Sequence, residues 1–105
     1  MTHLTSFLQT LLFELRSSSA RTRLRYASTR VRVDPSARVS MRAVLDAVHG
    51  GTITIGPNVL ISRGARILTH GGDVEIGADV SINDLAILYG HGGLRIGRGT
   101  RIAAQ

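Results

Sequence analysis

Apolar residues follow two different spacings along the chain, and the spacing changes near residue 30. The first segment has the i, i+3, i+4, i+7 spacing of an amphipathic helix, formed by Leu4, Phe7, Leu8, Leu11, Leu12 and Leu15. Further along, aliphatic residues recur at six-residue intervals within successive copies: Val33, Val39; Ile55, Ile61, Ile67; Ile76, Ile82, Leu88; Ile96, Ile102. We therefore predict an amphipathic helix and basic segment over residues 1–30 and a repeat domain over residues 31–105.

The six-residue interval is typical of short strands separated by tight corners. A second set of small or apolar residues lies between the first ones: Val59, Ala65, Val80, Ala86 and Thr100. Two inward positions in every six residues fit neither a helix of 3.6 residues per turn nor an alternating hairpin. Three such sides make about one triangular turn of a solenoid.

The tripeptide His-Gly-Gly marks each turn, since it begins at His49, His70 and His91, which are 21 residues apart. A repeat of this length is one triangular turn plus a small insertion. The Gly-Gly pair is the expected place for the insertion, because glycine tolerates a positive φ at a corner. Successive turns stack at the strand spacing of about 4.8 Å and form parallel sheets. The predicted fold is mostly β, a parallel β-helix preceded by the N-terminal helix.

Composition agrees with one small domain of this kind. The 105 residues are 43% hydrophobic and 19% charged, which is typical of a globular chain. The absence of cysteine excludes disulfides, iron–sulfur clusters, thiolate zinc sites and cysteine nucleophiles. Tryptophan is absent and only four residues are Phe or Tyr, which fits a narrow prism without room for large rings.

The positive charge is concentrated in the N-terminal third. All thirteen basic residues are arginines, against seven acids, which gives a net charge of +6. Eight of the arginines lie between Arg16 and Arg42, where Asp34 is the only acid. This segment could meet anionic lipid or an acidic substrate, or it could be a solvated face or pair with a neighbouring subunit. Nucleic acid is not an expected partner, because no aromatic residues interleave with the arginines and no binding motif is present.

The apolar stretch from Leu4 to Leu15 is too short to span a bilayer, which needs about 20 residues. No positive residue precedes it, so a signal peptide is not predicted. Two alternatives stay open: the helix packs on the domain or on oligomer partners, or it makes peripheral contact with an anionic membrane. The predicted localisation is cytoplasmic, at the inner membrane surface if the helix binds lipid.

Three hexads carry a resemblance to a known family: Ile55-Gly56-Pro57-Asn58-Val59-Leu60, Ile76-Gly77-Ala78-Asp79-Val80-Ser81 and Ile96-Gly97-Arg98-Gly99-Thr100-Arg101. The pattern resembles the hexapeptide-repeat acyltransferases, whose domain is a left-handed parallel β-helix. The segment Leu88-Tyr89-Gly90-His91-Gly92-Gly93 is most similar to the O-acetyltransferases of polysaccharide and surface-sugar synthesis. The resemblance implies a homotrimer that uses acetyl-CoA, bound between adjacent prisms, and a saccharide acceptor deprotonated by a histidine.

On this resemblance His91 is the first candidate for the general base and His70 the second. Asn83, Asp84 and Tyr89 are candidates for binding the acceptor, and Arg95, Arg98 and Arg101 for binding the phosphates of coenzyme A. Each has a structural alternative. The histidines could be corner residues stacked one turn apart, and Asn83 and Asp84 are common corner types. Alternation on an outward strand face would explain the arginines.

Relatives of this type continue for several coils beyond the point that corresponds to Gln105, and their catalytic histidine lies there. The chain could therefore be a C-terminally incomplete transferase or a non-catalytic trimeric scaffold, and its enzymatic activity stays open. A γ-type carbonic anhydrase also resembles this fold. No metal is expected, because the close-spaced histidine pair of that family is missing and histidines 21 residues apart would not converge on one ion.

Overall fold

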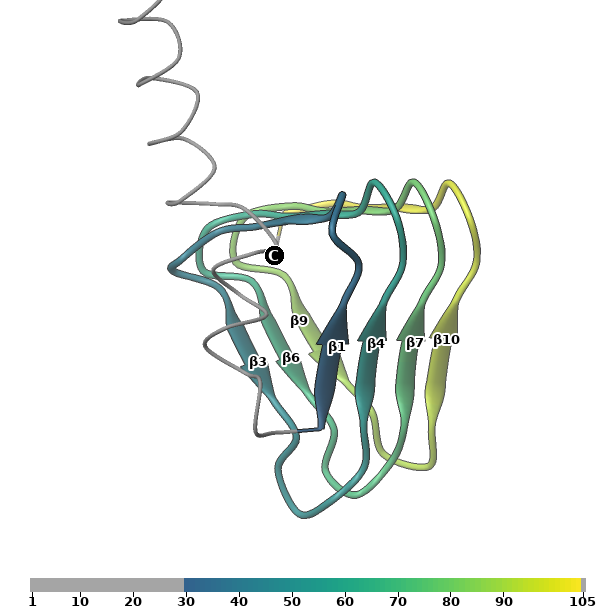
Figure 1. Ribbon diagram of the computed structural model, residues 1–105. Helices are drawn as coiled ribbons and strands as arrows, with labels where there is room; N and C mark the ends of the chain where they lie inside the picture. The colour runs from purple at the N-terminus through teal and green to yellow at the C-terminus, as the bar shows by residue number, and fades with distance from the viewer. Residues whose placement is uncertain (1–29, 105) are drawn as a thin grey trace, which may run out of the picture.

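The computed structural model describes residues 30–104 as a parallel β-solenoid of about three turns (Figure 1). The helix predicted over residues 1–30 lies outside the described residues, apart from Arg30, as does Gln105. Within residues 30–104 the strands are β1 (Val31–Val33), β2 (Arg38–Val39), β3 (Val44–Asp46), β4 (Ile53–Ile55), β5 (Leu60–Ile61), β6 (Arg66–Leu68), β7 (Val74–Ile76), β8 (Ser81–Ile82), β9 (Ile87–Tyr89), β10 (Leu94–Ile96) and β11 (Arg101–Ile102).

The strands form three parallel sheets, one on each side of a triangular prism. We call them face 1 (β1-β4-β7-β10), face 2 (β2-β5-β8-β11) and face 3 (β3-β6-β9). Every strand pairs with the strand one coil away, as in the register Val33↔Ile55 and Ile55↔Ile76. The prediction of a parallel β-solenoid is therefore confirmed.

The interior of the prism is filled by the residues that recur every six positions. Most of them are buried together in one aliphatic cluster, whose centre includes Ile61 and Ile82 with no exposed surface. Leu88 and Ile102, which belong to the last coils, pack against this cluster but are only partly buried. Burial of one such side chain contributes about 1.5–3 kcal/mol, so this column is the main source of stability.

One member of the second inward set differs from expectation. Val59, Ala65, Val80 and Ala86 are buried, but Thr100 is exposed. Its hydroxyl donates a hydrogen bond of 2.8 Å to the carbonyl oxygen of Gly97. Thr100 belongs to the last described coil, where no following coil within residues 30–104 covers it, so a polar residue is tolerated there.

The corner between face 3 and face 1 carries the His-Gly-Gly tripeptides and shortens from coil to coil. It comprises residues 47–52, then 69–73, then 90–93, which is six, five and four residues between consecutive strands. The insertion therefore lies where the glycine pairs predicted it. Positive φ angles of 89° at Gly50 and 86° at Gly51 show why glycine is needed in the longest of these corners.

Candidate active site

The three His-Gly-Gly histidines form a column along one edge of the prism. The ring centroids of His49 and His70 are 6.0 Å apart with the planes inclined by 26°. Those of His70 and His91 are 4.4 Å apart and nearly parallel, at 6°. The structure thus brings both candidates for the general base into direct contact with each other.

Tyr89 joins this column from the end of β9. Its ring centroid lies 5.3 Å from that of His70 and 5.8 Å from that of His91, in tilted geometry. The side chain is 55% exposed, so a face or edge of the ring remains open to solvent. The half-buried His70 and the exposed Tyr89 and His91 therefore form a cluster of three rings at the surface, which we call the ring cluster.

Two tight turns hold the histidines in place. The amide of Gly72 donates to the carbonyl of Thr69 at 3.0 Å, and the amide of Gly93 donates to that of Gly90 at 2.8 Å. His70 follows Thr69 with a φ of 46°, a left-handed conformation that histidine adopts more readily than most residues. In the next coil the left-handed position has moved to Gly92, with a φ of 71°.

Thr69 anchors the ring cluster to the coil before it. It is fully buried, and its hydroxyl lies 2.9 Å from the carbonyl oxygen of Val48 and 2.6 Å from that of Gly50. Both carbonyls belong to the six-residue corner; that of Val48 also accepts a hydrogen bond of 3.0 Å from the backbone amide of Gly71. A carbonyl without a donor is costly, so the Thr69 hydroxyl stabilises the longest corner chiefly through the carbonyl of Gly50. Sequence reasoning missed this residue; the signal for it is a hydroxyl directly before His70 in the repeat.

No acid within residues 30–104 orients the histidines of the ring cluster. Among the described residues, no group donates to or accepts from an imidazole nitrogen of His70 or His91; the recorded contacts of these rings are the stacking contacts. Ring orientation therefore comes from stacking and from the backbone turn. The stacked arrangement also accords with the structural alternative for these residues.

Asn83 and Asp84 lie at a different corner from the ring cluster, between face 2 and face 3. The side-chain amide of Asn83 donates a hydrogen bond of 2.8 Å to the carbonyl of Ile102 in the next coil. The Asp84 carboxylate is 3.8 Å from the guanidinium of Arg63 in the preceding coil. The structure does not bring either residue to His91 within one chain, and both make contacts between coils.

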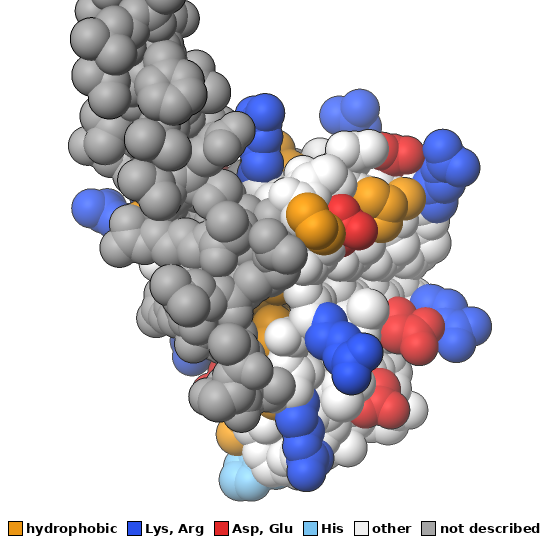
Figure 2. All heavy atoms as spheres, in the orientation of Figure 1, with side chains coloured by type: hydrophobic (Ala, Val, Ile, Leu, Met, Phe, Trp, Pro, Cys, Tyr) orange, Lys and Arg blue, Asp and Glu red, His pale blue; other side chains and the backbone are white. Residues whose placement is uncertain are grey.

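The three arginines predicted to bind phosphate do not converge on one point. Arg95, on face 1, contacts Glu75 at 2.9 Å, and Arg98, at the corner between face 1 and face 2, contacts Asp79 at 3.2 Å. Arg101 begins β11 on face 2 and has no carboxylate partner among residues 30–104. Figure 2 shows basic side chains beside acidic ones on the visible surface. These pairs are exposed, so each contributes at most about 1 kcal/mol.

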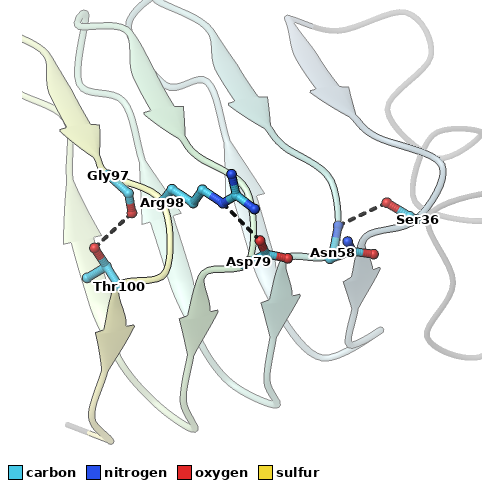
Figure 3. Close-up of polar contacts among 6 residues, drawn as sticks. All are labelled: Ser36, Asn58, Asp79, Gly97, Arg98 and Thr100. Atoms are coloured by element: carbon cyan, nitrogen blue, oxygen red, sulfur yellow. Dashed lines mark hydrogen bonds and ion pairs between the residues drawn. The ribbon is translucent and has the colours of Figure 1, made fainter.

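The corner between face 1 and face 2 carries a ladder of polar contacts from coil to coil (Figure 3). The backbone amide of Asn58 donates to the hydroxyl of Ser36 at 2.9 Å, and that hydroxyl donates to the carboxylate of Asp34 at 2.7 Å. Arg98 reaches back to Asp79 along the same edge (Figure 3). Polar residues at this corner thus satisfy each other and the backbone.

A shallow apolar hollow lies on face 3 and was not predicted. It has a volume of about 510 Å³ and is lined by Gly64, Arg66, Leu85 and Ile87. Leu85 and Ile87 are about half exposed, at 54% and 49%. The sequence signal for this hollow is Ile87, an apolar residue at an outward position beside the inward Leu88.

Within residues 30–104, no group of three or more acidic or histidine side chains has a geometry that could hold a metal ion. The same part of the chain contains no helix long and apolar enough to cross a membrane.

Comparison with known proteins returned no match: neither a protein-family model, nor a curated protein, nor a solved structure is significantly similar to this chain. The resemblance to the hexapeptide-repeat acyltransferases therefore depends on the hexads and the fold.

Proposed function

We propose that this chain is a left-handed parallel β-helix of the hexapeptide-repeat type and acts as an acetyl-CoA-dependent O-acetyltransferase on a saccharide hydroxyl. The observation that carries the proposal is the ring cluster, in which His91 stacks on His70 at 4.4 Å beside the exposed Tyr89. An imidazole and an exposed aromatic ring at one surface point can serve as a base and a platform for a sugar ring.

In the proposed reaction, His91 takes the proton from the acceptor hydroxyl as the hydroxyl oxygen attacks the carbonyl carbon of acetyl-CoA. The bond from that carbon to sulfur then breaks, and the thiolate of coenzyme A takes the proton from the imidazolium. The acetyl group ends on the sugar oxygen and no covalent enzyme intermediate forms. His70 packs against the face of His91 and limits its rotation.

The donor would lie along the outer surface that carries the arginines. Arg101 has no carboxylate partner among the described residues, so its guanidinium is the most readily available for a phosphate. Arg95 and Arg98 would exchange an exposed carboxylate for the donor's phosphates. Assembly as a homotrimer would place these arginines and the ring cluster of adjacent prisms around one groove.

The reaction can be followed by release of free thiol from acetyl-CoA in the presence of candidate saccharides. The protein contains no cysteine, so a thiol-reactive dye reports only coenzyme A. Loss of the base in His91→Ala should lower the rate by about 10²–10⁴-fold. His49→Ala is the matched control, because His49 belongs to the same column but has no recorded contact with Tyr89. Equal rates for both variants would exclude His91 as the base.

Binding of the donor can be tested separately from chemistry by thermal unfolding. Acetyl-CoA at 100 times its Kd stabilises the folded state by about 2.7 kcal/mol, which raises Tm by several degrees in a domain of this size. A folded protein whose Tm does not change in millimolar acetyl-CoA would contradict the proposal for this chain.

A non-catalytic trimeric scaffold, or a fragment of a transferase that lacks its catalytic histidine, is the second candidate. The observation that favours it is that no described group orients the imidazole nitrogens of His70 or His91. This candidate predicts a trimer in sedimentation equilibrium together with no thiol release and no effect of acetyl-CoA on Tm.

Peripheral contact of the N-terminal segment with an anionic membrane, with the cytoplasm as the compartment, is the alternative to its packing on the domain. Co-sedimentation of the full chain with anionic vesicles, compared with neutral vesicles, tests this contact. Failure to pellet with either kind would remove the peripheral membrane assignment.

A further inference from the structure

Face 1 and face 3 of the prism differ in the chemistry of their outward side chains. The outward row of face 1 is polar or charged throughout: Arg32, Thr54, Glu75 and Arg95. The outward row of face 3 carries the exposed apolar residues Val44 and Ile87 beside Asp46 and Arg66; Leu68 is already buried, and Tyr89 belongs to the ring cluster. A solvated sheet face normally carries polar residues, so the row on face 3 indicates a surface that another segment covers.

The outer surface of face 3 is hollowed where an apolar side chain would fit. Leu85 and Ile87 line the hollow together with Gly64, and the Leu85 side chain lies against Gly64, where a Cβ would meet it. Arg66 borders the hollow and has no carboxylate partner among the described residues. The covering segment should therefore be apolar and should carry a negative charge at its edge.

The size of face 3 argues against a second copy of the chain as the occupant. Three strands of three residues each present about 10 by 14 Å, an area of about 140 Å². A stable interface between separate proteins buries about 800 Å² per partner. A tethered segment of the same chain needs much less, because its effective concentration is in the millimolar range.

We infer that the apolar stripe of residues 4–15 of the same chain packs across β3, β6 and β9 as an amphipathic helix. Twelve residues make a helix about 18 Å long and about 10 Å wide, which is long enough to cross the roughly 14 Å occupied by the three strands. The stripe is continuous over this length, from Leu4 to Leu15.

The described fold begins beside this face. Arg30 directly precedes β1. In later coils the equivalent position ends the corner between face 3 and face 1. The carbonyl of Arg30 accepts a hydrogen bond of 2.9 Å from the amide of Ile53. The fourteen residues from 16 to 29 can extend up to about 46 Å, so the stripe can reach any part of face 3.

Charge complementarity fixes the orientation. Glu14 is the only acid in the first 29 residues. In a helix it lies three residues after Leu11, at the edge of the apolar stripe. Glu14 would therefore pair with Arg66 while the leucines cover Val44 and Ile87.

The inference can be tested by cross-linking the full-length protein, because the chain contains no native cysteine. The test variant carries Leu8→Cys and Ile87→Cys, and the matched control carries Leu8→Cys and Thr54→Cys, which places the second thiol on the outward row of face 1. With a short bismaleimide, the test variant should give an intramolecular product of one chain's mass, about tenfold faster than the control because of the higher effective concentration.

Equal rates for the two variants, or a product of twice the chain mass from the Ile87→Cys variant, would overturn the inference. If the cross-link forms in dilute solution without lipid and anionic vesicles abolish it, the result would support docking of the same stripe on face 3 in the free protein. If the cross-link is absent without lipid while the protein pellets with vesicles, the stripe binds membrane and the inference is wrong.

A charge exchange gives a second, independent readout. Arg66→Glu and Glu14→Arg should each lower the cross-linking rate, and the double variant should recover it. Arg32→Glu on face 1 is the control and should have no effect on the rate. Failure of the double variant to recover while both single variants remain folded would exclude the Glu14–Arg66 pair and the docking orientation built on it.

Discussion

The imidazole of His91 stacks on that of His70 with centroids 4.4 Å apart and planes inclined by only 6°, although their corners differ in length by one residue. In the longer corner the positive φ angles fall on His70 and Gly71, at 46° and 89°, whereas in the shorter corner they fall on Gly92 and Gly93, at 71° and 98°. Different backbone turns therefore deliver the two rings to the same line. The stacking of the rings therefore depends on the orientation of the side chains as well as on the spacing of the repeat.

Gly72→Ala should be one of the most destabilising substitutions in the chain. A Cβ at this position would overlap the carbonyl oxygen of Gly90, which is backbone and cannot turn aside. Forcing an extra methyl into such a site costs about 1–3 kcal/mol or more. Each kcal/mol lowers the Tm of a domain of this size by about 4–8 °C. Gly97→Ala is the control, since a Cβ there meets nothing within 4 Å. Equal Tm values for the two variants would contradict the prediction.

Thr69→Val should destabilise the protein although it keeps the shape of the side chain. The substitution removes the hydroxyl from the carbonyl of Gly50, while the carbonyl of Val48 keeps the Gly71 amide, so the expected cost is about 1–3 kcal/mol from one lost partner. Thr54→Val, on an exposed strand position, should change the free energy of unfolding little. Urea unfolding of both variants measures the difference, and a stable Thr69→Val would mean that water replaces the hydroxyl.

Ile61→Ala and Leu60→Ala form a matched pair on β5. Ile61 is fully buried, so its truncation should cost about 2–5 kcal/mol. Leu60 is the preceding residue, points outward and is 44% exposed, so its truncation should cost much less. Chemical unfolding that ranks the two in the opposite order would show that face 2 is covered in solution.

Arg101→Gln should weaken the binding of acetyl-CoA by about tenfold or more if its guanidinium contacts a phosphate. Arg32→Gln is the control, because Arg32 lies in the first coil, on face 1, far along the chain from the ring cluster. Titration calorimetry provides the Kd values. An unchanged Kd for Arg101→Gln, with donor binding intact, would exclude Arg101 from the donor site but leave the ring cluster in place.

Much of the fold could be predicted because the six-residue spacing reports directly which side chains point inward. Ile55, Ile61 and Ile67 are buried in one coil, as the spacing requires. The column of histidines also followed from their 21-residue spacing. The pattern carries less information about outward positions, since a residue such as Ile87 is exposed without breaking the repeat.

The candidate site was harder to predict because its partners come from other coils. The contact of Arg95 with Glu75 spans 20 residues and that of Arg98 with Asp79 spans 19. The 20-residue separation follows from the shortened third coil, which only the register reveals, and the 19-residue separation is a contact one position off that register. Asn83 and Asp84 are close to His91 in sequence, but one side of the triangle separates their corners.

The shortening corners also determine the order in which the coils can stack. A repeat with identical coils can slip by one turn at little cost, whereas here each coil fits only its own neighbour. Slippage by one coil would put Gly90 under the six-residue corner, whose carbonyls need the Thr69 hydroxyl. It would also place a threonine at the position of Gly90, where a Cβ would come within 2.6 Å of Val74. The successive lengths of six, five and four residues thus encode the correct register of the solenoid against its own misfolded alternatives.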